Sequence, residues 1–399
     1  MSFRPIKKLR IVQLVLALAA VFFLVNHAWA AQVKRTQLGS VYFDTDDISQ
    51  VIDIQTVKQS KTMVLLYPSP AANTSNYSGN TLFTAVFESD SKLIVSRDYA
   101  NVACTVTYVV VEFTSGVNVQ RGISAFSPGA PTNPAYTQKT ITLTQDMADD
   151  YQAFVVIQAR ANFARNDSDQ IAMITGQLPN KSTLYLQRDA TQYSSSSTPY
   201  ARTVNVVWQV VEFTDGAVVT AGETVFTAGT TSVTQNINPS HADPDITNLD
   251  HAFLIYNSRG TRYLNGTEAY YNVRGRILNA SQVKFDRGAS VANATVTVDW
   301  FVVELTDQGT NVRATYDTAV ASGSTGPAAP TLDPAIDMMR MFPLINTSGP
   351  TDTVTAPTTY EDEIRFAPSF PALSVKGVCY DSSTTPKSVW VTNFASNTV

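Results

Sequence analysis

The sequence predicts an all-β protein of tandem antiparallel β-sandwich domains that follow an N-terminal signal peptide. Three observations support this prediction. Val, Ile, Thr and Tyr dominate short runs that are separated by clusters of Gly, Pro, Asn and Ser, a pattern typical of strands and turns. No run beyond the N-terminal segment sustains a helical apolar period. The same order of strand-like runs recurs about every 95 residues, which indicates repeated domains.

Residues 1–30 have the layout of a secretory signal peptide. Basic residues precede an apolar run from Ile11 to Val25, and the segment closes on Ala28-Trp29-Ala30. An uncleaved anchor is the alternative, but the run is shorter than the roughly 20 residues that a spanning helix needs. We therefore expect a secreted or cell-surface protein whose mature chain has no transmembrane segment.

One strand-like sequence motif occurs three times, and a divergent fourth copy follows. The three full copies are VTYVVVEFTSG (Val106–Gly116), VNVVWQVVEFTDG (Val204–Gly216) and VTVDWFVVELTDQG (Val296–Gly309). They align on Tyr108, Trp208 and Trp300, and SVWVTNF (Ser388–Phe394) adds Trp390. This spacing indicates three complete domains and one divergent or incomplete fourth.

Each copy is preceded by two further strand-like runs, the second of which ends in arginine: Arg97, Arg188 and Arg287. Segments rich in Pro and Gly occupy residues 127–135, 237–245 and 322–334 and are expected to be linkers. The predicted division is therefore a signal peptide (1–30), repeats 31–128, 129–232 and 233–326, and a divergent repeat 327–399.

Alternation along the repeated strand places its aromatic residue in a core. In the second copy Trp208 shares one face with apolar residues and with Glu212 at the end of the strand. The opposite face begins polar and becomes apolar only in its later half, which we expect a loop or the next domain to cover. The matching acids in the other copies are Glu112 and Glu304.

Three interpretations of this repeated acid remain open. It is a rim residue that accepts hydrogen bonds from turn amides or pairs with a cation such as Arg160 or Arg259, or it binds a ligand or metal, or it is catalytic. Arg188 is disfavoured as its partner, because in a direct hairpin about 26 Å of strand would separate the two. Repetition favours the rim interpretation, since a fold constraint recurs in every domain.

Catalytic motifs are missing from the sequence. It contains no H-E-x-x-H, C-x-x-C or G-x-S-x-G pattern, so zinc protease, redox and serine hydrolase chemistry lack their required residues. No catalytic residue is assigned, and we expect the protein not to be an enzyme. A glycosidase-like pair of carboxylates stays open, because such a pair is defined by its spatial separation.

Two binding hypotheses rest on local clusters of residues. Acidic loops could bind calcium, with Asp44, Asp46, Asp47, Asp243 and Asp245 as candidates, although solvated turns explain the same residues. The loop YLNGTEAYYN offers Tyr263, Tyr270, Tyr271 and Asn265 as a platform for a sugar, although half-buried strand aromatics explain it too.

Charge and cysteine content add two constraints. The formal net charge is −5 at pH 7 and no basic cluster offsets it, so nucleic acid is not an expected partner. Cys104 and Cys379 are the two cysteines, and whether they pair is left open.

The runs AFLIYNSRG, QVKFDRGA and VDWFVVEL resemble domains of uncharacterised exported bacterial proteins and of phage tail or fibre proteins. More faintly, the order of strands ending in V-x-W resembles the H-type lectin domain, which implies a six-stranded antiparallel sandwich that binds sugars. From the sequence we expect an exported structural or adhesive protein. Its partner would be an extracellular glycan or protein, or further copies of itself. A multivalent carbohydrate-binding protein and a glycan-active enzyme are the alternatives.

Overall fold

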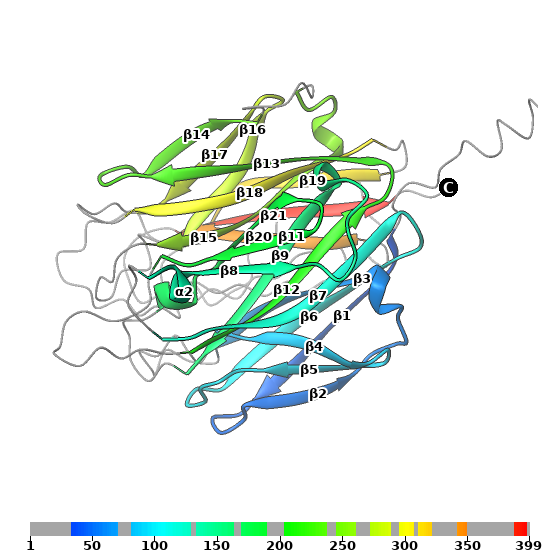
Figure 1. Cartoon of the computed structure of the whole chain (residues 1–399), viewed down its shortest axis with the longest axis vertical. Coiled ribbons are helices and arrows are strands. Elements are labelled where there is room, and N and C mark those ends of the chain that lie inside the picture. The colour runs from blue at the N-terminus through cyan, green and yellow to red at the C-terminus, as the bar shows by residue number, and fades with distance from the viewer. Residues whose placement is uncertain are drawn as a thin grey trace, which may run out of the picture.

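The structure is a computed structural model, and most of the residues that it describes lie in β-strands (Figure 1). It describes residues 33–70, 81–128, 133–162, 169–189, 203–237, 245–260, 272–288, 295–306, 310–320, 341–348 and 387–396. The predicted signal peptide lies outside these residues. All pairings between strands in the described parts are antiparallel, which confirms the predicted fold class.

Unit 1 has six strands: β1 (Val33–Phe43), β2 (Ser49–Asp53), β3 (Thr62–Pro70), β4 (Thr84–Ser89), β5 (Lys92–Ser96) and β6 (Cys104–Phe113). They form one sheet in the order β1-β6-β3 and another in the order β2-β5-β4. The repeated aromatic strand, β6, is the central strand of the first sheet. We call this sheet the inner sheet and its partner the outer sheet.

Units 2 and 3 repeat this arrangement. In unit 2 the inner sheet is β7-β12-β9 and the outer sheet is β10-β11-β8; in unit 3 they are β13-β18-β15 and β14-β17-β16. The unit 2 strands are β7 (Val117–Phe126), β8 (Gln138–Thr142), β9 (Ala153–Ala161), β10 (Thr175–Asn180), β11 (Thr183–Gln187) and β12 (Val204–Phe213). The unit 3 strands are β13 (Ala217–Phe226), β14 (Ser232–Asn236), β15 (Ala252–Gly260), β16 (Val273–Asn279), β17 (Gln282–Arg287) and β18 (Val296–Leu305).

The described part of the fourth repeat is a single sheet with the order β19-β21-β20. Its strands are β19 (Thr310–Val320), β20 (Met341–Ser348) and β21 (Lys387–Ser396), and β21 contains Trp390. Short helices complete the fold: α2 (Pro134–Thr137) and the 3-10 turns η1 (Gln59–Lys61), η3 (Asp150–Gln152), η4 (Asp169–Ala172) and η5 (Leu249–His251). η1, η3 and η5 each come directly before the third strand of their unit.

Strand pairing places the junctions between units at tight turns. β7 and β13 pair with the last strand of the unit that follows the turn, so the units run 33–113, 117–213 and 217–305, with the fourth sheet in 310–396. Gly116 and Gly216 adopt positive φ in these turns, a conformation that glycine enters without steric cost. The junctions therefore differ from the predicted boundaries at residues 128, 232 and 326, and the Pro-rich segments connect strands within a unit.

The two faces of the central strand in an inner sheet pack into two different hydrophobic cores. In β6, Val106 and Val110 belong to the core between the sheets of unit 1, and Val109 and Val111 point the other way into a core that the units share. In β18, Trp300 and Val302 lie inside unit 3. The shared core contains apolar residues from all three units and from β20: Val109, Val111, Phe113, Val211, Phe213, Phe253, Phe301, Val303, Leu305 and Leu344.

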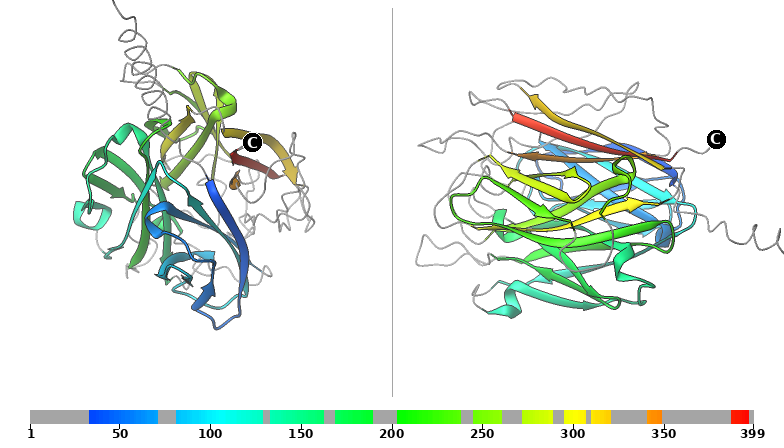
Figure 2. Two further views of the ribbon diagram at one scale, coloured as in Figure 1. Left: turned by 90° about the vertical axis from the view of Figure 1, so that its right-hand side faces the viewer. Right: turned by 90° about the horizontal axis from the view of Figure 1, so that it is seen from above.

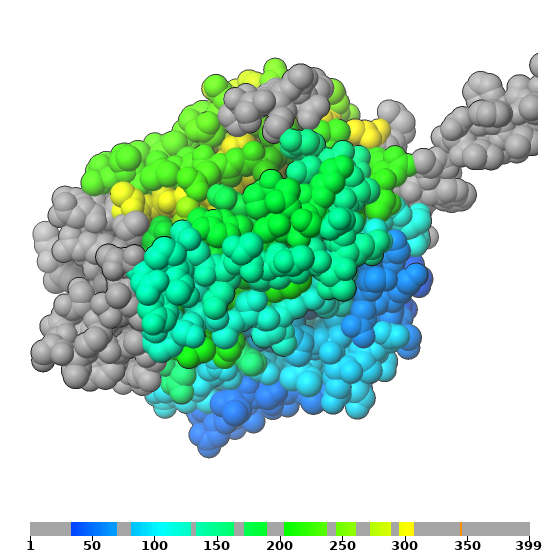
Figure 3. Space-filling model, viewed as in Figure 1, coloured from blue at the N-terminus to red at the C-terminus, as the bar shows by residue number. Residues whose placement is uncertain are grey.

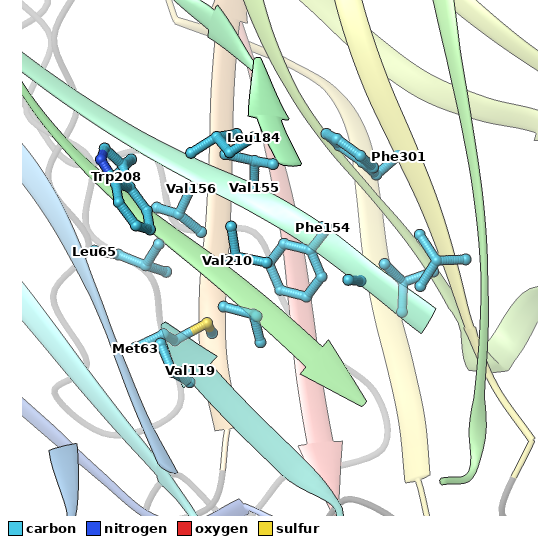
Figure 4. Close-up of a cluster of buried hydrophobic side chains, with 14 of the residues drawn as sticks. Met63, Leu65, Val119, Phe154, Val155, Val156, Leu184, Trp208, Val210 and Phe301 are labelled. Atoms are coloured by element: carbon cyan, nitrogen blue, oxygen red, sulfur yellow. The ribbon is translucent and has the colours of Figure 1, made fainter. Parts of the chain in front are cut away.

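The shared core confirms that the later half of the opposite face is covered by neighbouring units. Phe154 lies 5.9 Å from Phe213 and 6.0 Å from Phe253 between ring centroids, so aromatic rings from units 2 and 3 are in direct contact. Figure 4 shows Met63 of unit 1 beside Val119 of unit 2, and Leu65 of unit 1 beside Val156 of unit 2. Figure 2 (left) shows the strands of units 1, 2 and 3 grouped around a common centre, and the units abut without a gap on the face shown in Figure 3.

Candidate functional site

The arginine that ends the fifth strand of each unit is buried in the unit's own sandwich. Arg97, Arg188 and Arg287 are 1%, 1% and 3% exposed. Arg188 Nε donates to Tyr136 O (2.8 Å) and its Nη2 to Ser127 O (2.7 Å), while Arg287 Nε donates to Thr230 O (2.7 Å). In each unit the guanidinium thus binds backbone carbonyls of the loop between the first two strands.

A phenylalanine at the end of the first strand lies under each guanidinium. The carbon at the guanidinium centre lies 5.5 Å from the Phe43 ring for Arg97, and 5.0 Å from Phe126 for Arg188 and from Phe226 for Arg287. Burial lowers the pKa of Arg188 to about 10, which leaves it protonated at neutral pH. This cation–π and carbonyl arrangement fixes a loop and leaves the arginine no access to an external ligand.

The repeated glutamates accept hydrogen bonds from backbone amides of the loop that leads into the 3-10 turn. Glu112 accepts from Lys58 N (3.1 Å), Glu304 from Asn248 N (2.8 Å) and Thr247 N (2.9 Å), and Glu212 from Ala148 N. All three are buried, at 2–8% exposed. This geometry matches the rim interpretation in its turn-amide form.

In unit 1 the repeated glutamate, Glu112, also binds two cationic side chains. Lys34 Nζ and Arg35 Nε each lie 3.0 Å from a Glu112 carboxylate oxygen. Burial would raise the pKa of Glu112, but the Lys58 amide and the two cations together hold it below its usual value. Arg188 and Glu212 do not meet, because β11 and β12 lie in different sheets of the sandwich and form no hairpin.

The Asp that follows the buried arginine reaches into the next unit. Asp98 of unit 1 pairs with Arg160 Nε of unit 2 at 3.0 Å, and Asp189 of unit 2 pairs with Arg259 Nε of unit 3 at 3.2 Å. Arg160 and Arg259 occupy equivalent places near the ends of β9 and β15. Unit 1 is therefore joined to unit 2, and unit 2 to unit 3, by the same ion pair, and these two arginines bind aspartates, not the repeated glutamates.

The junction between units 2 and 3 carries additional acids. Arg259 Nη1 lies 2.7 Å from Asp299 Oδ2 and Nη2 lies 2.9 Å from Glu223 Oε2. Gln177 Nε2 donates to Asp299 Oδ1 (2.8 Å), and Thr175 Oγ1 accepts from Arg259. Burial raises the pKa of Asp299 and of Asp189 despite the attraction of Arg259. One guanidinium is thus shared by three carboxylates at this junction.

Two glutamines close the free edge of β3 at the junction between units 1 and 2. Gln209 Oε1 accepts from Val64 N (2.9 Å) and its Nε2 donates to Val64 O (2.8 Å). Gln158 Nε2 also donates to Val64 O (3.0 Å), while its Oε1 accepts from Ala85 N (2.8 Å). Side chains of unit 2 thereby satisfy an edge strand that would otherwise be open for pairing.

A cavity of about 310 Å³ lies where the third strands of the units meet. Leu65, Val156 and Leu254 line it together with Leu344 of β20. Its polar lining residues include Gln158 and Tyr256. The side-chain amide of Gln158 is hydrogen-bonded through both its oxygen and its nitrogen. The Tyr256 hydroxyl donates to Val273 O (2.7 Å) and accepts from Gly275 N (2.9 Å). The described wall is therefore mainly apolar.

The remaining predicted binding residues are only partly placed. Tyr263, Asn265, Tyr270 and Tyr271 lie outside the described residues, as do Asp243 and Cys379. Asp44 and Asp46 are exposed, Asp47 Oδ2 accepts from Asp44 N (2.9 Å), and Asp245 is exposed in a separate loop. Within the described part of the chain, no three His, Cys, Asp or Glu side chains gather in a way that could hold a metal ion.

Cys104 is buried in the core of unit 1. No helix among the described residues is long and apolar enough to cross a membrane.

Comparisons with known proteins give no relative for this chain. No family model, curated protein or solved structure matches it. The molecule is therefore defined by its architecture: tandem β-sandwich units, each of two antiparallel three-stranded sheets, around a shared core.

Proposed function

We propose that this chain is an exported, non-enzymatic structural or adhesive protein whose units act as one stiff block. The observation that carries the proposal is the shared core, because inner sheets that bury apolar residues of several units in one cluster resist separation. The ion pairs between units add to this coupling. Such a block suits an extracellular assembly or surface, where a protein works by holding its shape.

The use of the repeated residues supports the same proposal. Glu112, Glu212 and Glu304 hold loops through backbone amides, and the buried arginines hold others through carbonyls. These contacts are made within the chain, as those of structural groups are. The residues that recur from unit to unit therefore make contacts that hold the fold of each unit together.

The proposal is tested in the cells that produce the protein. We expect antibodies against the chain to label intact cells or the extracellular fraction, and we expect deletion of the gene to impair attachment or an extracellular assembly. A chain found inside the cell with residues 1–30 retained would contradict the proposal.

A glycan array probed with the full-length chain distinguishes the carbohydrate-binding alternative. The structural version predicts no saturable binding to any glycan. Saturable binding that a soluble form of the same sugar abolishes would replace it with the lectin-like version. The intact chain is needed, because separated units would expose the apolar residues of the shared core.

A further inference from the structure

A lysine, an asparagine and a glutamate meet at the junction between units 1 and 2. Lys61 Nζ lies 3.1 Å from Asn118 Oδ1, and Asn118 Nδ2 lies 3.5 Å from Glu212 Oε2. Lys61 ends η1 in unit 1, while Asn118 and Glu212 are register partners on β7 and β12 of unit 2. The amine of one unit is thus held against the carboxamide of the next, with a carboxylate beside that carboxamide.

We propose that Lys61 and Asn118 join in an intramolecular amide (isopeptide) bond, with Glu212 as the proton carrier. The neutral Lys61 amine forms a bond from Nζ to Cγ of Asn118. Glu212 takes the proton that Nζ gives up and delivers it to Nδ2, the Cγ–Nδ2 bond breaks, and ammonia leaves. One amine and one carboxamide become one secondary amide and one ammonia, so the step needs no oxidant or other reactant.

The surrounding contacts hold the reacting groups in place. Lys61 Nζ also donates to Val117 O, and Arg121 of β7 donates to Gln59 O (2.6 Å) and to Thr62 O on the two sides of Lys61. Glu212 is 3% exposed, and its other oxygen accepts from Ala148 N. Fixing both partners in this way replaces a bimolecular encounter by a positioned one, which favours the reaction.

The local electrostatics favour the neutral amine that the reaction requires. Burial and the neighbouring Lys58 both lower the pKa of Lys61, while Glu212 acts in the opposite direction. A lowered pKa increases the fraction of amine that can attack at neutral pH.

The other units supply an internal comparison. The residue before the third strand is Gln152 in unit 2 and His251 in unit 3, and the second residue of the first strand is Val218 in unit 3. The junction between units 2 and 3 keeps the acid, Glu304, but Gln152 replaces the amine of Lys61 and Val218 replaces the carboxamide of Asn118. The acid therefore belongs to the repeat, whereas the reactive pair is a feature of one junction.

The bond would close the chain between residues 61 and 118 and link the units covalently. A cross-link of this kind restricts the unfolded chain and keeps the two units joined after unfolding. This role suits the proposed stiff block but does not depend on it, because the bond is detected by mass whatever the protein does.

The test is the intact mass of the full-length purified chain under denaturing conditions. We expect most molecules to be lighter than the sequence mass by one ammonia, and a branched tryptic peptide to join Lys61 to Asn118. Lys61→Arg and Asn118→Ala should each restore the sequence mass, whereas Lys58→Arg, which alters the neighbouring lysine, should keep the loss. Glu212→Gln should slow the conversion by about 10²–10⁴-fold, the usual contribution of a positioned proton carrier.

The peptide map separates this bond from other losses of ammonia. A wild-type chain at its sequence mass, with Lys61 and Asn118 in separate peptides, would overturn the proposal. An ammonia loss located within a single Asn or Gln residue would overturn it as well. Because these outcomes rest on the wild-type chain, they hold even if the Glu212 variant folds poorly.

Discussion

Gly222 of β13 lies directly opposite Trp300 of β18, so close that a Cβ on the glycine would come within 2.2 Å of the indole Cζ2. The same relationship recurs between Gly122 and Trp208 and between Gly39 and Tyr108. In each unit the aromatic ring therefore covers the backbone of the first strand. Glycine is needed there for space, since any side chain would occupy the position of the ring.

Gly222→Ala should destabilise the protein by about 1–3 kcal/mol, the usual cost of an overpacked core. The free energy of unfolding in urea measures this change. The same substitution in a Trp300→Phe background should cost less, because the smaller ring leaves room for the methyl group. An equal cost in both backgrounds would show that steric conflict with the ring is not the cause.

Arg287→Lys should lower the free energy of unfolding by about 1.5–3 kcal/mol, the usual value of a hydrogen bond to a charged group. A lysine cannot reproduce the two separate bonds from Nε to Thr230 O and from Nη2 to Thr227 O. It also loses the planar contact with Phe226. Lys92→Arg, at a half-exposed position on β5, is the matched control and should be nearly neutral. A neutral Arg287→Lys would mean that its charge alone matters.

Glu304→Gln should destabilise unit 3 by about 1–3 kcal/mol, because it weakens a buried charged acceptor that holds the loop before η5. Amide hydrogen exchange at Thr247 and Asn248 should then become faster, which locates the effect in that loop. Glu88→Gln, at an exposed position on β4, is the control. Unchanged exchange at the two amides would contradict the rim role that we assign to the repeated acid.

Sequence reasoning predicted the part of the fold that side-chain alternation determines. Alternation along β12 placed Trp208 inward and Glu212 at the rim, and the apolar end of the opposite face indicated that another unit covers it. The partners of Glu212 and Glu304 could not be predicted. They are backbone amides of Ala148, Thr247 and Asn248, and an amide is present at almost every residue type.

One further signal was present in the sequence. The pattern G-x-x-x-F ends the first strand of each unit, as Gly39–Phe43, Gly122–Phe126 and Gly222–Phe226. The glycine of the pattern leaves space for the Tyr or Trp ring of the last strand, and the phenylalanine lies under the buried arginine. The junctions between units escaped prediction because short turns at Gly116 and Gly216 look like hairpins, whereas the long Pro-rich segments look like linkers.

The acid cluster around Arg259 predicts a pH dependence for the junction between units 2 and 3. Burial raises the pKa of Asp299 in the folded state, so folding favours its protonated form. The contribution of Asp299 to stability is then fully present below its unfolded pKa of about 3.9, and it is lost as the pH rises through the folded pKa. Asp189 contributes in the same direction. The groups that face Asp299 are Arg259 and Asn257 on β15, Glu223 on β13, and Thr175 and Gln177 on β10. Asp189, after β11, contacts the other side of Arg259.

Asp299→Asn removes this titration while keeping the size of the side chain. The stability of the variant relative to the wild type should therefore rise from pH 4 to pH 7, roughly the range that begins at the unfolded pKa. Urea unfolding at several pH values measures the difference, in which the opposite contribution of Glu112 cancels. Asp53→Asn, whose side chain is 89% exposed, should show no such trend. A flat or falling difference for Asp299→Asn would mean that attraction by Arg259 outweighs the burial of the carboxylate.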